Sequence, residues 1–195
     1  MSRYLSFILL LFLLTSVSCS IQGSLQGLYG YQKKVSKQAP GLIQKPEESI
    51  CEISNTTESV IYTIKGSELR RCISHNGQSL LYLWSPNCKS DVCIPLNNVQ
   101  KICNKYGWEL FIVAEFYDYD KMIQKYNIER PIFGIDTDYY KSNLTQKYLE
   151  RFFHDLLDNE KAYEHNYYSY FKNGKLMGGN DNLFELLNDL DLQTR

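Results

Sequence analysis

Two cysteines five positions apart, Cys88 and Cys93, are the residues whose type and spacing point most directly to chemistry. A cysteine thiolate attacks a disulfide, and a second cysteine then resolves the mixed disulfide that forms. In a regular α-helix, Cα atoms five residues apart are separated by roughly 8.6 Å, which exceeds the usual range for a disulfide. A bond between Cys88 and Cys93 therefore requires a non-helical segment, which Ser90 or Asp91 would provide by capping a helix that starts after Cys88.

That cap would place Cys93 in the first turn of the helix, where Pro95 is also tolerated. Unpaired backbone N–H groups and the helix dipole favour a thiolate there, and Cys88 on the preceding loop would share their field. Lys89 adds positive charge nearby, while Asp91 opposes it. The pair is thus a candidate for thiol–disulfide exchange. The competing interpretation is a structural bridge that only fixes the turn.

The N-terminus has the pattern of a signal peptide over residues 1–18. Arg3 supplies the positive start, residues 5–14 are almost entirely apolar, and small residues precede Cys19. The apolar run is short for a membrane span. Cys19 resembles the lipidated cysteine of bacterial lipoproteins, with simple secretion as the alternative. We therefore expect an exported protein of the cell envelope, held to a membrane by a lipid on Cys19 and facing the periplasm or the exterior.

Export also bears on the remaining cysteines, because disulfides persist outside the cytoplasm. We expect Cys51 and Cys72 to form a separate, structural disulfide, which closes a loop of about twenty residues and contributes a few kcal/mol. Cys103 lies at helical spacing among apolar residues. It is expected to remain unpaired, buried and inert.

Composition limits the architecture and the partners. The chain has 195 residues, a net charge of -1 and 44% hydrophobic residues, which suits one globular domain with some additional chain. No block of lysine and arginine is present, so we expect no nucleic acid partner. Residues 19–50 are rich in Gly, Pro and polar residues and predict a flexible, lipid-anchored tether. The folded domain is expected over residues 51–195, without a cofactor.

Within that domain, apolar runs at 60–64, 80–84 and 110–114 predict strands. A helical pattern at 96–106, closed by Gly107, lies between the last two runs and makes them parallel. Further along, the sequence predicts a short helix at 120–126, a brief apolar segment at 131–135, a helix at 144–157, a hairpin around Asn173-Gly174 and a last helix over 183–190 capped by Asp181. The fold class is α/β, with a central mixed sheet flanked by helices on both faces.

Three segments resemble the thioredoxin superfamily, in particular the exported thioredoxin-like reductases and redoxins of bacterial envelopes. Residues 81–88 are similar to that family's strand, which ends in an aromatic residue and leads through a short loop to the attacking cysteine. Residues 171–175 resemble its late hairpin, and residues 126–131 with Asp136 resemble the middle segment of the redoxin branch. The resemblance spans roughly residues 57–190. It implies a thioredoxin-like fold and an oxidoreductase in which Cys88 attacks and Cys93 resolves the mixed disulfide. The implied partner is an envelope protein with a thiol or a disulfide.

The sequence departs from the family at two places. The family's redox pair is Cys-x-x-Cys, but here four residues separate the cysteines and Asp91 stands three after Cys88. The family also has a cis-proline before the hairpin, which shapes the groove for the partner's cysteine. Asn166, or His165 if the loop shifts by one, stands at that place, and Pro131 is assigned to the middle segment.

Three other functions stay open. The main alternative is a non-catalytic thioredoxin-fold lipoprotein that binds another envelope protein through the altered loop. Ser85 three positions before Cys88 matches an arrangement used in peroxide reduction. Cys88, Cys93 and His165 together would suit copper, because thiolates are soft ligands, although surface positions are the alternative for His165, His75 and His154.

Overall fold

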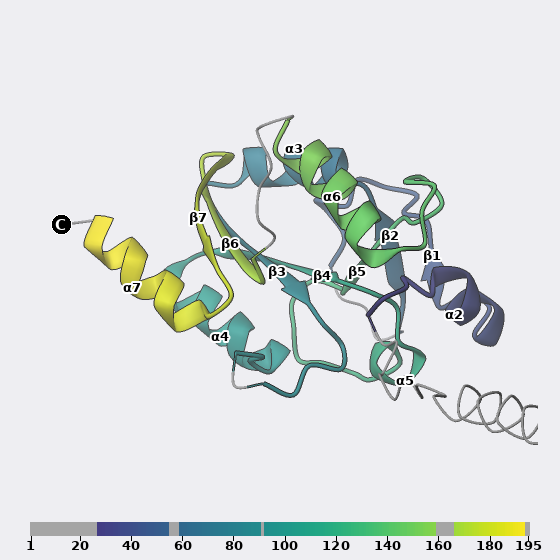
Figure 1. The fold of residues 1–195 in the computed structure, drawn as a ribbon. Helices are drawn as coiled ribbons and strands as arrows, with labels where there is room; N and C mark the ends of the chain where they lie inside the picture. Colours follow the sequence, from purple (N-terminus) through teal and green to yellow (C-terminus); the bar gives the residue numbers. More distant parts are fainter. Residues whose placement is uncertain (1–26, 55–58, 91, 159–165, 194–195) are drawn as a thin grey trace, which may run out of the picture.

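The computed structural model describes residues 27–54, 59–90, 92–158 and 166–193, which form an α/β fold (Figure 1). The segment expected to be a signal peptide, Cys19, Asp91 and His165 lie outside the described residues. In chain order the elements are α2 (Gln32–Gln38), β1 (Ile43–Gln44), β2 (Ile61–Ile64), α3 (Gly66–His75), β3 (Gln78–Trp84), α4 (Leu96–Tyr106), β4 (Glu109–Ala114), α5 (Tyr119–Met122), β5 (Phe133–Ile135), α6 (Thr145–Leu156), β6 (Tyr168–Lys172), β7 (Lys175–Asn180) and α7 (Leu183–Gln193).

The strands form one mixed sheet in the order β1-β2-β5-β4-β3-β6-β7. The first five strands in this order run parallel, whereas β6 pairs antiparallel with β3 and β7 antiparallel with β6. β3 therefore has a partner on each side, as its continuous apolar run predicted. The parallel pairing of β3 and β4 is also confirmed.

Helices cover both faces of the sheet, as predicted. In β3, Leu80 and Tyr82 face the core that includes α4 and α7, while Leu81 and Leu83 face the core that includes α3 and α6. Figure 1 shows these two pairs of helices on opposite sides of the strands. Because β3 is buried on both faces, its side chains cannot alternate between apolar and polar, and the sequence shows a continuous apolar run instead.

Residues 27–50 belong to the fold, so the tether expected over 19–50 is wrong for this part. Val35 of α2 and Leu42 are buried in the core, and β1 adds an edge strand beside β2. The buried side-chain carbonyl of Gln32 accepts hydrogen bonds from the backbone N–H and the hydroxyl of Thr137, both at 2.8 Å. A polar, Gly- and Pro-containing stretch is thus fixed by a few anchors rather than by a regular apolar pattern.

Helix α3 was not among the elements predicted from the sequence. Gly66 is the first residue of this helix, and its N–H donates to the hydroxyl of Tyr140 at 2.9 Å. A Cβ at position 66 would collide with the backbone of α6, including the carbonyl oxygen of Phe152. The glycine is required because two helices approach each other closely at this point.

Local turn chemistry was predicted more accurately. Gly107 ends α4 with a φ of 70°, and the β6–β7 turn places Asn173 and Gly174 at positive φ. The cap of α7 is an exception: Asn182, not Asp181, accepts the N–H of Phe184 at 2.9 Å. The side chain of Asp181 instead accepts the N–H of Tyr167 at 3.0 Å.

The expected disulfide between Cys51 and Cys72 is present, with 5.1 Å between the Cα atoms. Cys72 is completely buried on α3. Cys103 is unpaired and buried on α4, as expected, and burial raises the pKa of its thiol to about 12. No described helix is both long enough and apolar enough to cross a membrane.

Candidate functional site

Cys88 and Cys93 lie on the loop between the end of β3 and the start of α4 and form a disulfide, with 6.0 Å between their Cα atoms. The segment is non-helical, which the bond requires. Two turns shape it, as the N–H of Cys88 donates to the carbonyl of Ser85 at 3.1 Å and that of Cys93 to the carbonyl of Ser90 at 3.0 Å. Both cysteines are half-buried.

The relation of the cysteines to α4 differs from the prediction. α4 begins at Leu96, and the preceding residue, Pro95, accepts the N–H groups of Asn98 and Val99 through its carbonyl. Ser90 therefore does not cap this helix, and Cys93 does not lie in its first turn. Because the helix dipole acts mainly within the first turn, it gives Cys93 less support than expected. The Ser90 hydroxyl instead lies 3.2 Å from the Cys88 Sγ and 3.5 Å from the Cys93 Sγ.

Two tyrosines of the sheet hold the second half of this loop. The Tyr168 hydroxyl donates to the carbonyl of Val92 at 3.1 Å, and that of Tyr82 to the carbonyl of Ile94 at 3.4 Å. The two rings stack with 4.5 Å between their centroids. Burial raises the pKa of both hydroxyls, so both remain protonated donors. The segment around Cys93 is thereby fixed to β3 and β6.

The first half of the loop is fixed from another direction. The side-chain amide of Asn87 donates to the carboxylate of Asp118 at 2.8 Å, and the same carboxylate accepts the N–H of Lys121 at the start of α5. Cys88 therefore lies between an anchor on α5 and the end of β3. Each half of the disulfide loop has its own attachment to the fold.

Cys88 opens into a depression of about 450 Å³ beyond the carboxyl ends of β3 and β4. Glu115, Phe116 and Tyr167 also line this depression, together with Ser85 and Asn87. Glu115 directly follows β4, and its N–H donates to the carbonyl of Trp84 at 2.8 Å. The parallel pairing of the two strands places Glu115 and Cys88 around one hollow.

Glu115 is a candidate site residue that the sequence analysis missed. Burial raises the pKa of its carboxyl, and a hydrogen bond from Ser85 opposes this shift in part. The pKa of the neighbouring Tyr167 is raised by burial and then by the negative charges of Glu115 and Asp181. The sequence does contain a sign of this role. Glu115 directly follows the apolar run 110–114, and ligands of α/β sheets bind beyond the carboxyl ends of strands.

The histidine and proline positions considered in the sequence analysis add no residue to the candidate site. Asn166, one candidate for the cis-proline place, precedes β6, and the described residues contain no cis peptide bond. His75 and His154 are exposed on α3 and α6. Within the described ranges, no three His, Cys, Asp or Glu residues gather where they could hold a metal ion. The copper hypothesis used His165, which lies outside those ranges.

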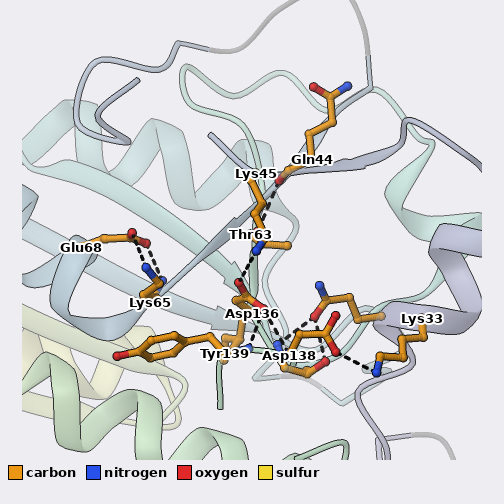
Figure 2. Close-up of polar contacts among 12 residues, drawn as sticks. Lys33, Gln44, Lys45, Thr63, Lys65, Glu68, Asp136, Asp138 and Tyr139 are labelled. Atoms are coloured by element: carbon orange, nitrogen blue, oxygen red, sulfur yellow. Dashed lines mark hydrogen bonds and ion pairs between the residues drawn. The ribbon is translucent and has the colours of Figure 1, made fainter. Parts of the chain in front are cut away.

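A second polar cluster surrounds Asp136 at the end of β5 (Figure 2). The Asp136 carboxylate is 4% exposed and accepts the N–H groups of Asp138 and Tyr139 at 3.1 and 3.0 Å. Lys45 of the neighbouring chain segment lies 4.0 Å from its other oxygen, and Lys33 of α2 pairs with Asp138 at 3.0 Å. Asp136 therefore holds the turn after β5 in place, which is a structural role.

No protein-family model, no curated protein and no solved structure matches this chain.

Proposed function

We propose that this protein is an exported, membrane-anchored thiol–disulfide oxidoreductase with a thioredoxin-like fold. One observation carries the proposal: the Cys88–Cys93 disulfide lies at the carboxyl end of β3, and Cys88 opens into a hollow that it shares with the half-buried Glu115. The position of the loop after an inner strand, the helices on both faces and the antiparallel hairpin beside β3 support the fold.

In the reduced protein, the Cys88 thiolate attacks a disulfide of an envelope protein. A bond forms between the Cys88 sulfur and one partner sulfur, and the partner's own S–S bond breaks and releases a thiolate. The Cys93 thiolate then attacks the Cys88 sulfur, which forms the Cys88–Cys93 disulfide and releases the partner's second sulfur. The partner gains two electrons and this chain loses two, and the reverse sequence passes the disulfide to a partner dithiol.

Glu115 accepts the proton that the Cys88 thiol gives up. Its raised pKa makes the carboxylate a stronger base than an exposed glutamate, and it is positioned at the same hollow as the sulfur. The Ser90 hydroxyl, 3.2 Å from the Cys88 Sγ, stabilises the resulting thiolate by a hydrogen bond. These two groups take over part of the role that the helix start was expected to play.

A trapping experiment tests this chemistry. The Cys93→Ser variant is incubated with glutathione disulfide and analysed by mass spectrometry after the free thiols are blocked. We expect a stable mixed disulfide between glutathione and Cys88, because no resolving cysteine remains. The matched Cys88→Ser variant should form much less adduct at Cys93, since Cys93 is held away from the hollow by Tyr168 and Tyr82. Equal labelling at both positions, or none at Cys88, would contradict the assigned roles.

One observation favours a second function, that of a binding protein in which the bridge is only structural. The Cys93 half of the loop is held by the Tyr168 and Tyr82 hydroxyls, and a fixed loop suits a recognition surface. In that case Cys93→Ser would remain unmodified by glutathione disulfide at Cys88, while the fold stayed intact by circular dichroism.

A further inference from the structure

A pocket lined by lysines lies between α2 and the turn that follows β5. It has a volume of about 810 Å³, and its lining includes Lys33, Lys34 and Lys37 of α2, together with Asp138 and Lys141 of the turn. We refer to it as the lysine pocket. This volume is in the range of pockets that bind small molecules. None of these residues belongs to the candidate redox site.

The charge of the lysine pocket is strongly positive. Lys33 pairs with Asp138 at 3.0 Å, as Figure 2 shows. Lys34, Lys37 and Lys141 form no ion pair within the described part of the chain, which leaves three ammonium groups around one hollow. Mutual repulsion of these groups is relieved when an anion binds among them.

The polar groups between the lysines are suited to phosphate oxygens. Ser142, Asn143 and Tyr31 also line the pocket and offer hydroxyl and amide donors. Ammonium groups bind phosphate as point charges and do not require a planar ligand. The chemistry of the lining therefore favours a phosphate-bearing ligand.

Exposed apolar side chains beside the pocket indicate that the phosphate belongs to a membrane lipid. Leu28 and Tyr29 are 47% and 37% exposed, and the Tyr29 ring lies edge-on to Tyr31 of the pocket lining, with 6.1 Å between centroids. Both residues belong to the segment that leads into α2 from the N-terminal side, where residues 5–14 are almost entirely apolar. Lysines next to exposed aromatic and aliphatic side chains form the surface that proteins present to anionic bilayers.

We propose that the lysine pocket binds the phosphate of an anionic phospholipid and holds this face of the domain against a negatively charged bilayer. The proposal is independent of the redox proposal, since it uses no cysteine. It has one geometric consequence for the candidate site. Gly27 lines the Cys88 hollow, and the chain reaches Lys33 six residues later, so one segment borders both sites.

The test uses the whole 195-residue chain on two kinds of vesicle, phosphatidylcholine alone and phosphatidylcholine with 30% phosphatidylglycerol. Backbone hydrogen exchange is followed by mass spectrometry, because it reports on the pocket even when the N-terminus already binds both vesicles. We expect exchange over residues 31–38 and 137–143 to slow by roughly a hundredfold on the anionic vesicles, the scale that three lysines give near such a surface.

Charge-matched variants separate the pocket from net charge. The double variant Lys34→Gln/Lys37→Gln should lose the slowing, whereas Lys172→Gln/Lys175→Gln, with the same charge change at the β6–β7 turn, should retain it. Exchange in β3 serves as a control for folding of every variant. Equal exchange on both vesicles, or equal loss in both variants, would overturn the proposal. The same slowing produced by inorganic phosphate on neutral vesicles would also overturn it, in favour of a soluble ligand.

Discussion

The close approach of α3 and α6 at Gly66 yields a stability prediction that the structure specifies in detail. In Gly66→Ala, the new Cβ meets the backbone of α6 at the carbonyl of Phe152 and, at 2.7 Å, the nitrogen of Leu156. A backbone cannot rotate away as a side chain can, so the two helices must separate. The substitution also disturbs the buried hydrogen bond from the Gly66 N–H to Tyr140.

The size of the effect follows from two opposing contributions. Overpacking of a tight contact costs about 1–3 kcal/mol, and weakening a buried hydrogen bond adds about 1 kcal/mol. Alanine gains at most about 1 kcal/mol over glycine in a helix. The net loss is about 1–3 kcal/mol, which lowers the melting temperature of a domain of this size by roughly 2–12 °C.

Gly77→Ala is the matched control, because a Cβ there would meet nothing within 4 Å. We expect it to be neutral or stabilising by about 0.5 kcal/mol through the unfolded state. Urea unfolding of both variants, with the disulfides kept oxidised, gives the two free energies of unfolding. If Gly66→Ala were as stable as Gly77→Ala, the packing of α3 on α6 described above would be wrong.

Three further predictions concern single side chains. Ser79 has a buried hydroxyl without a hydrogen-bond partner among the described residues, so Ser79→Ala should leave the free energy of unfolding unchanged or raise it by about 1 kcal/mol; a clear loss of stability in urea would contradict this. Tyr168→Phe should cost about 1 kcal/mol in urea and speed hydrogen exchange over residues 92–94, because the carbonyl of Val92 loses its donor; unchanged exchange would argue against the anchor. Burial raises the pKa of Glu115 in the folded state, so the folded protein loses stability as the pH rises from about 4 toward neutral and this carboxyl ionises. Glu115→Gln should remove that part of the pH dependence and gain stability relative to the parent as the pH rises; parallel curves of unfolding free energy against pH would refute the assignment.

The parts of the fold that depend on local sequence were predictable. The inner strands β3 and β4 are apolar throughout because both of their faces are buried, and a run of this kind is visible without a structure. Gly107 and the Asn173-Gly174 turn need positive φ, which few other residues adopt readily. Export favoured disulfides in this chain, and the structure shows the one expected between Cys51 and Cys72.

The parts that depend on contacts between distant residues were not predictable in the same way. Gly66 starts a helix because α6, some 80 positions later, leaves no room for a side chain. The segment 27–50 is fixed by Gln32 and by the two-residue strand β1, and neither leaves a periodic signal. The sequence located the helical pattern of α4 at 96–106 but could not exclude an earlier start, because Ser90 is as good a cap in isolation as many residues that do cap helices.

The sequence indicated the two cysteines of the candidate site but not the residues that surround them. The spacing showed that a Cys88–Cys93 bond needs a non-helical loop, and the structure has both the loop and the bond. Glu115 was missed because it comes next to Cys88 only through the parallel register of β3 and β4. The anchors Tyr82 and Tyr168 belong to strands, and nothing in their positions in the sequence indicates that their hydroxyls hold the loop.

The most direct test of the central proposal is a redox titration of the two disulfides in one sample. The protein is equilibrated in glutathione buffers of graded potential, its free thiols are alkylated, and each cysteine is quantified by mass spectrometry. The Cys51–Cys72 bond, whose Cys72 half is buried, is the internal reference and should stay oxidised throughout. The account predicts that Cys88–Cys93 opens reversibly at a potential between about -120 and -270 mV, the range of catalytic dithiols. The prediction is contradicted if the Cys88–Cys93 bond, like the reference bond, is still oxidised in buffers with potentials below about -300 mV.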